Sequence, residues 1–388
     1  MDFELSEEQR AVRDLCREFA REVVAPAADE LDREHRFPYD IVRQMGELGV
    51  FGLPFPEEWG GAGADFLSYC LAIEEISRGD AGVGITLEAA VSLGAAPIHA
   101  YGTLEQKQAW LPELLAGRRL WAFGLTEPGA GSDAGATRTR AEFEDGQWVI
   151  NGSKQFITNS GTEISAGVTI TAVTARADGA ARGEISAILV PTGAPGYVVL
   201  PPYRKLGWHS SDTHPLAFDD CRVPEENLLG RRGGGYQQFL HTLTGGRIAI
   251  AALSVGLGQA CLDAALAYAK ERTAFGRSIS RFQAIQFKLA DMATEVELAR
   301  MATYRAAVAY QASGGKTAGE VQRLAAMAKL FASETSKRAA DQAVQIHGGY
   351  GFIEDYPVAR YWRDVKVNEI GEGTSEVQRM LIARELGC

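Results

Sequence analysis

Residues 121–136, WAFGLTEPGAGSDAGA, join a short apolar run to a loop of glycines and other small residues. Gly129, Gly131 and Ala134 match the spacing of the G-x-G-x-x-G/A dinucleotide-binding fingerprint, which works only where the glycines open a helix. Pro128 precedes the first glycine, and residues 137–150 alternate polar and apolar side chains as a strand does. We therefore reject an NAD site and predict a loop that holds backbone donors and hydroxyls against a flat ligand. An ordinary glycine-rich turn between strands is the alternative.

The composition is that of an ordinary globular protein. The 388 residues are 46% hydrophobic and 23% charged, which suits about two or three domains of roughly 150 residues each. The net charge of -11 argues against nucleic acid or an anionic membrane surface as the main partner. The five cysteines are scattered and never form a C-x-x-C pair, so we expect no zinc site, no other metal and no disulfide framework.

The N-terminal stretch and the lengths of the apolar runs bear on the cellular location of the protein. The N-terminal stretch MDFELSEEQR is acidic and lacks the basic region and apolar core of a secretory signal. No apolar run approaches the roughly 18 residues of a membrane span, so no integral membrane association is expected. We predict a cytoplasmic bacterial protein, or a mitochondrial matrix protein only if a transit peptide has been removed.

The periodicity of the chain changes twice, which predicts three domains over residues 1–120, 121–229 and 230–388. The first block is helical: Ser6 and Gln9 have the spacing of a capping box, and an apolar face follows at Val12, Leu15, Phe19 and Val23. The middle block contains short β-rich runs, WVING, GVTITAVTA, EISAILVP and GYVVLPP, separated by turn residues. This pattern predicts an antiparallel β-barrel or sandwich.

The third block returns to long amphipathic helices. Two apolar faces recur at spacings of three and four: Ile285, Leu289, Met292, Val296 and Ala299 in one helix, and Leu324, Met327, Phe331 and Thr335 in another. Three or four such helices joined by short loops predict an antiparallel four-helix bundle. The expected fold class is therefore α+β and multidomain, with helical, β and helical blocks in that order.

Six segments in this order resemble the acyl-CoA dehydrogenases, flavin-dependent enzymes, and in particular their short-chain, butyryl-like members. The segments are TEPGAGSD at 126–133, NGSKQFITN at 151–159, FDDCRVPEENLLG at 218–230, ERTAFGR at 271–277, QIHGGYGF at 345–352 and YWRDVKVNEIGEGTSEVQR at 361–379. The resemblance covers nearly the whole chain. It implies FAD as cofactor, an acyl-CoA substrate, an electron-transfer flavoprotein as electron acceptor, and a homotetramer built as a dimer of dimers.

The resemblance implies α,β-dehydrogenation of a saturated acyl-CoA to the trans-2-enoyl-CoA. Glu372 is the implied catalytic base for the α proton, and flavin N5 receives the β hydride. A carboxylate in an apolar cleft suits this task because desolvation raises its pKa. Glycines flank Glu372, and Ser375 with Gln378 has the spacing of a capping box for the last helix. The carbonyl of the thioester would be polarised by the backbone N–H of Glu372 and a ribityl hydroxyl of the flavin.

Alternatives to this base remain open from the residues alone. Glu372 could be merely an acidic residue before a helix, where the helix dipole favours it. Glu369 and Glu376 lie one helical turn away and compete for the role. In one branch of the family the base precedes the arginine of Gly245-Gly246-Arg247, and Gly246 at that position removes this rival.

The resemblance also implies the residues that bind cofactor and substrate. Phe123, Leu125 and Thr126 would meet the isoalloxazine edge, Phe156 its face in place of the usual tryptophan, and Thr158 its reactive nitrogen. The remaining implied cofactor residues are Gly131, Ser132, Arg272, Gln283, Gln345, Gly348, Gly349, Thr374 and Glu376. Arg272 and Gln283 would reach the FAD of a neighbouring subunit. The implied substrate residues are Ser132, Gly246, Arg247 and Gly373.

Two features bear on specificity. Gly371 stands where several short- and medium-chain members carry tyrosine, so we hypothesise a pocket for a short, branched or cyclic acyl chain. Residues 83–93 are expected to set chain length, and Glu88 among them has no role that the sequence explains. An acyl-CoA oxidase and a non-catalytic flavin-binding relative remain the alternative functions.

Overall fold

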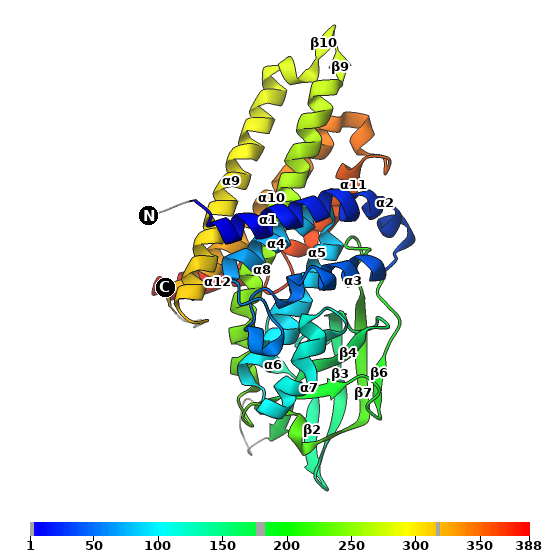
Figure 1. Ribbon diagram of the computed structural model, residues 1–388, viewed down its shortest axis with the longest axis vertical. Coiled ribbons are helices and arrows are strands. Elements are labelled where there is room, and N and C mark those ends of the chain that lie inside the picture. The colour runs from blue at the N-terminus through cyan, green and yellow to red at the C-terminus, as the bar shows by residue number, and fades with distance from the viewer. Residues whose placement is uncertain (1–3, 176–182, 316–318) are drawn as a thin grey trace.

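The computed structural model describes residues 4–175, 183–315 and 319–388, and it arranges the chain as helices, a sheet and helices again (Figure 1). The expected absence of a secretory signal rests in part on residues 1–3, which lie outside the described residues. The N-terminal helices are α1 Glu7–Phe19, α2 Ala25–Glu34, α3 Tyr39–Glu47, α4 Phe66–Gly79, α5 Ala81–Glu88, α6 Ala96–Tyr101 and α7 Leu104–Leu115. Two π-helical segments, η1 Ala20–Val24 and η4 Ala89–Ala95, connect some of them.

Helix α1 begins at the predicted capping box. Ser6 Oγ accepts from Gln9 N at 3.1 Å, and Gln9 Oε1 accepts from Ser6 N at 2.9 Å. The predicted apolar face is wrong at Leu15, which is 44% exposed, because Cys16 faces the core with Phe19. The wider π-helical turn η1 then moves the buried line to Val24.

The middle block is one eight-stranded sheet that encloses its own apolar core. Its strands are β1 Leu120–Gly124, β2 Arg140–Glu144, β3 Gln147–Thr158, β4 Ser165–Ala175, β5 Glu184–Pro191, β6 Tyr197–Val199, β7 Thr213–Pro224 and β8 Leu228–Leu229. The order is β6-β7-β3-β2-β4-β5-β8, with β1 beside β4. Most neighbouring strands of the predicted antiparallel sheet are antiparallel, but β1 and β2 pair with β4 in parallel.

No long helix begins at the glycine-rich loop that follows β1. The glycines are followed only by the three-residue 3-10 turn η5, Ala134–Ala136, which supports the rejection of a dinucleotide fingerprint. The strand-like alternation over residues 137–150 is confirmed as two strands, because β2 and β3 form a hairpin there. Asp145 and Gly146 turn the chain with φ of 49° and 78°, the conformation that Asp-Gly favours in a tight hairpin.

The C-terminal block contains α8 Gly235–Glu271, α9 Gln283–Ala312, α10 Glu320–His347, α11 Pro357–Asn368 and α12 Ser375–Glu385. The long helices α8, α9 and α10 pack together, α12 packs on α10, and α11 is a helix beyond the four expected. A hairpin of β9 Thr273–Ala274 and β10 Arg277–Ser278 joins α8 to α9 at the top of Figure 1. Of the two predicted apolar faces, that of α10 fails at Met327, which is exposed.

Two helical segments are long and apolar enough to cross a membrane, contrary to the expectation from the sequence. They are residues Ala81–Tyr101 and Gly235–Glu271, and 89% and 78% of their most apolar windows are buried inside the protein. Both therefore have the burial typical of core helices in a globular fold.

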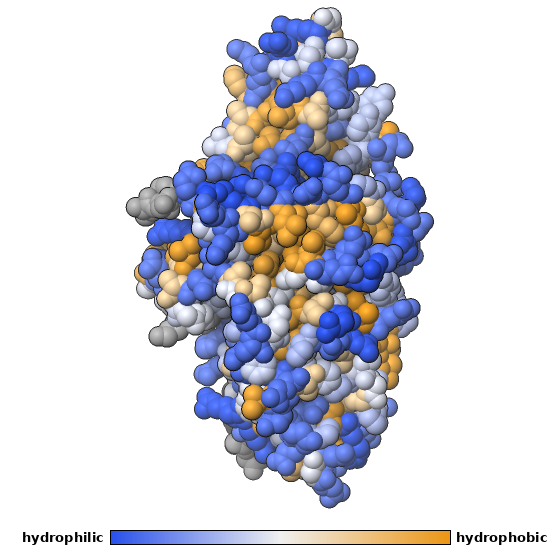
Figure 2. All heavy atoms as spheres, viewed as in Figure 1, coloured by the Kyte–Doolittle hydropathy of each residue, from blue (hydrophilic) through white to orange (hydrophobic). Residues whose placement is uncertain are grey.

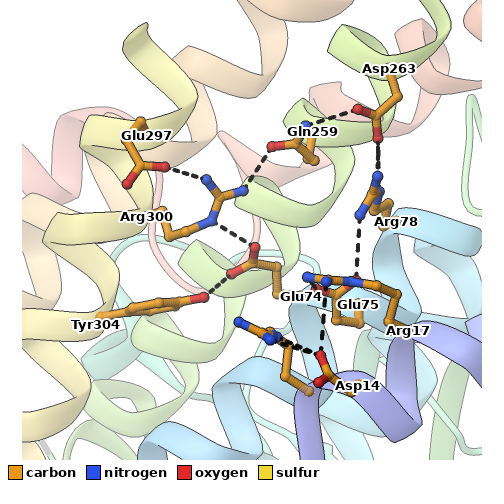
Figure 3. Close-up of polar contacts among 11 residues, drawn as sticks. Asp14, Arg17, Glu74, Glu75, Arg78, Gln259, Asp263, Glu297, Arg300 and Tyr304 are labelled. Atoms are coloured by element: carbon orange, nitrogen blue, oxygen red, sulfur yellow. Dashed lines mark hydrogen bonds and ion pairs between the residues drawn. The ribbon is translucent and has the colours of Figure 1, made fainter. Parts of the chain in front are cut away.

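A network of charged side chains joins the first and third blocks (Figure 3). Glu74 of α4 is buried, and its carboxylate accepts from Arg300 Nε at 2.9 Å and from Tyr304 OH at 2.8 Å, both on α9. Arg78 of α4 reaches Asp263 of α8 at 2.5 Å. Because these partners come from distant parts of the sequence, the network holds α4 against the long C-terminal helices that carry part of the site.

Candidate functional site

A tight loop between α11 and α12 carries Glu372. Gly371 N donates to Val367 O at 2.8 Å, which ends α11, and Thr374 is the N-cap of α12. Glu372 has φ of 52° and Gly373 has φ of 98°. Left-handed backbone at a non-glycine residue is strained and is concentrated at functional sites. The loop therefore depends on its surroundings to hold Glu372 in this conformation.

The predicted capping box at the start of α12 is wrong by one residue. Thr374 Oγ1, not Ser375, accepts from Val377 N at 3.3 Å. Gln378 instead turns back into the loop, where its Nε2 donates to Gly373 O at 2.8 Å. The glutamine thus stabilises the strained loop and does not close a capping box.

Two buried cations hold the same loop. Arg247 Nε of α8 donates to Glu372 O at 3.3 Å, and Lys329 Nζ of α10 donates to Gly373 O at 2.8 Å. Arg247, expected near the substrate, thus contacts the backbone of Glu372. Sequence reasoning missed Lys329, whose only signal was a lysine on the apolar face of a helix. The loop is therefore held in place from α8, α10 and α12.

The Glu372 carboxylate lies in a dry environment. Both of its oxygens are buried, and no hydrogen-bond partner for them lies among the described residues. Burial raises the pKa of Glu372 to about 7, while interactions with Glu88, Arg247 and Lys329 lower it. A carboxyl with a pKa close to neutral pH is well matched to general-base catalysis.

Gly246 on α8 makes room for this carboxylate. A Cβ atom at position 246 would overlap Glu372 Oε2, whereas a Cβ at the adjacent Gly245 would meet Tyr310 OH at 3.3 Å, a tight contact that a shift of a few tenths of an ångström at the end of the tyrosine side chain relieves. The glycine predicted to remove a rival base thus has a second effect, which is to let α8 approach Glu372 closely.

We expect Gly246→Ala to lower the rate of acyl-CoA oxidation by roughly 10²-fold, because the added methyl group displaces the Glu372 carboxylate by about 1 Å or more. Stopped-flow measurement of flavin reduction checks this. Gly245→Ala is the matched control on the same helix and should stay near the wild-type rate. Equal rates for both variants would show that the position of the carboxylate does not depend on Gly246.

Glu88 is the residue for which the sequence offered no role. It is the last residue of α5, it is 0% exposed, and both carboxyl oxygens are buried without a hydrogen-bond partner among the described residues. Burial, followed by the charge of Glu372, raises the pKa of Glu88 well above its usual range. The signal in the sequence that could have indicated a functional role for Glu88 was an acidic residue inside an apolar segment.

The residues implied for the isoalloxazine ring gather on neighbouring strands. Phe123 of β1 stacks on Phe239 with ring centroids 4.0 Å apart, and Gln155 N of β3 donates to Thr126 O at 2.8 Å. This bond brings Thr126 next to Phe156, which is 61% exposed and has φ of 61°. Thr158 lies two residues further along β3, and Leu125 lies between Phe123 and Thr126.

A buried ion pair fixes this region. Lys154 Nζ of β3 lies 2.8 Å from Glu127 Oε1, and neither side chain is accessible to more than a few per cent. Lys154 Nζ also donates to Leu125 O at 3.3 Å, while Glu127 accepts from Arg138 N at 2.7 Å. The pair, which sequence reasoning missed, ties both ends of the glycine loop to the sheet. Gly131 and Ser132 lie exposed within that loop.

The remaining implied cofactor residues lie elsewhere. Arg272, Gly348 and Gly349 line a pocket of about 520 Å³ together with Tyr268, His347 and Tyr350. Gln345 is exposed at the end of α10, and Gln283 is exposed at the start of α9. Thr374 is the N-cap of α12, and Glu376 lies in the first turn of that helix. Figure 1 shows the β9–β10 end of α8 and the sheet in opposite halves of the molecule.

The residues of these two regions fit the parts of FAD. Exposed Phe156 offers an aromatic face, and Thr126 and Thr158 offer hydroxyls beside it. In the pocket, the guanidinium of Arg272 suits phosphate oxygens, and added Cβ atoms at Gly348 and Gly349 would meet no atom within 4 Å. Within residues 4–175, 183–315 and 319–388, no group of three or more His, Cys, Asp or Glu side chains could hold a metal ion.

Fold and site together define a three-domain protein with a buried carboxylate beside surfaces suited to a flavin nucleotide. Three segments match the acyl-CoA dehydrogenase family: residues 6–118 its N-terminal domain, 122–221 its middle domain and 233–387 its C-terminal domain. The chain therefore belongs to the acyl-CoA dehydrogenase family. It is a flavin-dependent oxidoreductase that dehydrogenates acyl-CoA thioesters, and its cofactor is FAD.

Individual relatives match over the full length. The chain is 51% identical to a probable acyl-CoA dehydrogenase of Bacillus subtilis over 100% of both chains, and 45% identical to a short-chain specific acyl-CoA dehydrogenase of Clostridium acetobutylicum, also over 100% of both. Butyryl-CoA dehydrogenase from Megasphaera elsdenii shares 42% identity with a TM-score of 0.94, covering 100% of both chains. A chain in a structure titled for the electron transferring flavoprotein of Acidaminococcus fermentans shares 46% identity with a TM-score of 0.95, covering 100% of this chain and 99% of that one.

Proposed function

We propose that Glu372 is the catalytic base that removes the α proton of a saturated acyl-CoA. The observation that carries this proposal is the buried carboxylate, free of hydrogen-bond partners among the described residues, with a pKa raised by burial to about 7. Glu372 accepts the proton that leaves Cα, and its backbone N–H donates to the thioester oxygen as negative charge develops there. The bound FAD supplies the acceptor for the β hydride.

The other residues position this base. Arg247, Lys329 and Gln378 hold the carbonyls of Glu372 and Gly373, so the backbone N–H of Glu372 keeps its direction during the reaction. Gly246 and Gly373 allow the substrate to approach the loop closely. Ser132, exposed in the glycine loop, contacts the thioester and pantetheine in this proposal.

We further propose that FAD lies across a subunit interface within a homotetramer. The residues for the flavin ring and those of the Arg272 pocket lie in opposite halves of one chain, which supports a cofactor shared between neighbours. Large apolar side chains are also exposed on the C-terminal block, among them Phe275, Phe287, Phe352 and Met380. Figure 2 shows apolar side chains between α8 and α9 below the β9–β10 hairpin.

The proposal extends to the electron acceptor, the location and the domain boundaries. We propose an electron-transfer flavoprotein as electron acceptor, a cytoplasmic location and three domains bounded at residues 120/121 and 229/230. The similarity to a chain in a structure titled for an electron transferring flavoprotein supports the acceptor. The change from helices to strands after α7 and back before α8 supports the boundaries.

A short acyl chain is the proposed substrate class, supported by the short-chain and butyryl relatives. At Gly371 an added Cβ would meet only Val367 O, at 3.5 Å, so space lies beside the base. We expect Gly371→Tyr to lower the relative rate with branched and cyclic acyl-CoAs more than with butyryl-CoA, because the ring fills this space. Steady-state kcat/KM values across the panel check this, and an unchanged ranking would contradict it.

The decisive experiment is an anaerobic titration. The purified flavoprotein is mixed with straight, branched and cyclic saturated acyl-CoAs, and the flavin absorbance is followed. Bleaching by one class confirms the reaction and names the substrate, while bound FAD that no acyl-CoA reduces contradicts it. Reoxidation of the reduced enzyme by oxygen faster than by an electron-transfer flavoprotein would indicate an oxidase.

A further inference from the structure

We propose that His209 is a positioning residue for the flavin site: its imidazolium holds the loop of residues 203–213 against helices α2 and α11, and the loop is held less firmly when the ring loses its proton. The inference rests on the proposed place of the flavin ring, against Phe156. It makes the retention of FAD dependent on pH.

The 203–213 loop begins and ends beside residues implied for the flavin ring. Tyr203 N donates to Thr213 O at 3.1 Å, so the two ends of the loop are joined. The ring of Tyr203 packs on that of Phe156 with centroids 5.1 Å apart. Thr213 of β7 is the register partner of Thr158 on β3. A displacement of the loop therefore moves the aromatic face and the hydroxyl that the flavin ring would meet.

The tip of the 203–213 loop packs on α11, the helix that leads to Glu372. Trp208 N donates to Asp364 Oδ1 at 2.6 Å, and a Cβ atom at Gly207 would overlap the same oxygen. Trp208 has φ of 52°, a left-handed conformation that is strained at a non-glycine residue. The tip therefore depends on its contacts to keep this conformation. Those contacts link the flavin face of the sheet to the helix that precedes the base.

His209 joins this tip to two helices. Its side chain is 10% exposed, and its Nδ1 lies 2.9 Å from Asp32 Oδ1 of α2. Its Nε2 lies 3.0 Å from the backbone oxygen of Lys205 in the same loop. Arg363 of α11 donates to Asp32 Oδ1 at 3.1 Å, and the same Nη1 lies 3.2 Å from His209 Nδ1. A neutral imidazole has one N–H, so only the imidazolium donates to both oxygens.

The groups around His209 favour its protonated form. The hydrogen bond to Asp32 raises the pKa of His209 above its ordinary value, against the opposing effects of burial and of Arg363. His35, the C-cap of α2, stacks on the His209 ring with centroids 3.8 Å apart. Burial, followed by the charge of His209, lowers the pKa of His35, so a neutral ring covers the charged one. The ammonium of Lys205 is directed into the loop, where it donates to a backbone oxygen and a hydroxyl.

The hold on the loop therefore weakens as the pH rises. A histidine whose pKa is raised in the folded state stabilises that state below its unfolded pKa, and the stabilisation is lost as the pH rises through the folded pKa. At higher pH Asp32 keeps Arg363 but loses its charge-assisted hydrogen bond from His209. Because the closed loop places Tyr203 behind Phe156, protonation of His209 and binding of FAD favour each other.

The first test is the rate at which FAD leaves the holoenzyme, followed by the fluorescence of the released flavin. We expect the wild-type rate to rise about 10-fold between about pH 6 and about pH 9. His209→Arg keeps a cation at every pH and should release FAD at the slow rate throughout. His209→Gln should release it at the fast rate throughout. A wild-type rate that does not rise with pH, or a rise that both variants retain, would overturn the proposal.

His99→Gln is the matched control for the loss of a histidine. His99 contacts Phe55 among the N-terminal helices, with ring centroids 5.5 Å apart. This variant should release FAD with the wild-type dependence on pH. If it abolishes that dependence as His209→Gln does, the effect does not come from the 203–213 loop and the proposal fails. Thermal unfolding establishes that each variant is folded.

A second measurement does not depend on where the flavin binds. The chain has six histidines, so NMR spectra of the holoenzyme with ¹³C-labelled histidine can follow each ring. The His209 resonance, identified by its loss in His209→Gln, should titrate above the ordinary histidine pKa, and Asp32→Asn should lower its midpoint. A midpoint at or below the ordinary value would overturn the proposal. Retention of FAD by Phe156→Ala as firmly as by wild type would instead contradict the proposed place of the flavin ring, so the two failures are distinguishable.

Discussion

Replacing Glu372 by glutamine should lower the anaerobic rate of flavin reduction by an acyl-CoA by about 10²- to 10⁴-fold, the range for loss of a general base. The amide has nearly the same shape as the carboxylate but cannot accept the α proton. Because the pKa of Glu372 is raised to about 7, wild-type kcat/KM should rise with pH through that value as the carboxyl ionises. Stopped-flow absorbance at several pH values measures both effects.

Glu369→Gln is the matched control. Glu369 is a carboxylate in the same segment, but its side chain pairs with Lys366 at 2.6 Å. We expect this variant to reduce flavin at close to the wild-type rate, and both variants to retain FAD. If the Glu372→Gln enzyme reacts as fast as wild type, another carboxylate is the catalytic base.

Replacing Glu127 by glutamine should lower the free energy of unfolding by about 3–5 kcal/mol, because it leaves the buried Lys154 ammonium without its counter-charge. Equilibrium unfolding in urea measures the loss. Burial favours the neutral form of Glu127, but Lys154 and backbone donors dominate and lower its pKa to about 2. A carboxyl whose pKa is lowered in the folded state stabilises the fold at pH values above its unfolded pKa. The difference in free energy of unfolding between wild type and variant should therefore shrink as the pH falls from about 4.5 toward 2. Flavin affinity should fall too, since the pair holds the loop beside Thr126.

Two further variants test the cause. Glu144→Gln removes an exposed carboxylate that lies 4.0 Å from Arg222, and it should cost less than about 1 kcal/mol. The double change Glu127→Gln with Lys154→Met removes the unpaired charge and should recover most of the lost stability. No recovery in the double variant would indicate that packing, and not the buried charge, accounts for the loss.

The features that the sequence predicted correctly are local ones. The capping box of Ser6 and Gln9 and the change from helical to strand periodicity depend on residues a few positions apart. The left-handed backbone at Glu372 and Gly373 was not among the predictions, which expected the flanking glycines only to let the substrate approach closely. The failures are local as well: the Asp145-Gly146 turn was not predicted, and Cys16 instead of Leu15 faces the core in α1.

The sequence by itself determined the order of the three blocks, the resemblance to acyl-CoA dehydrogenases and the loop that carries Glu372, because periodicity, turn chemistry and short motifs are written in neighbouring residues. Only the tertiary structure decided that the Glu372 carboxylate is buried, that Lys329 and Arg247 hold its loop, and that Lys154 pairs with Glu127. These contacts join distant segments. Their strength arises from the removal of water around the charges, and only the packed chain removes that water.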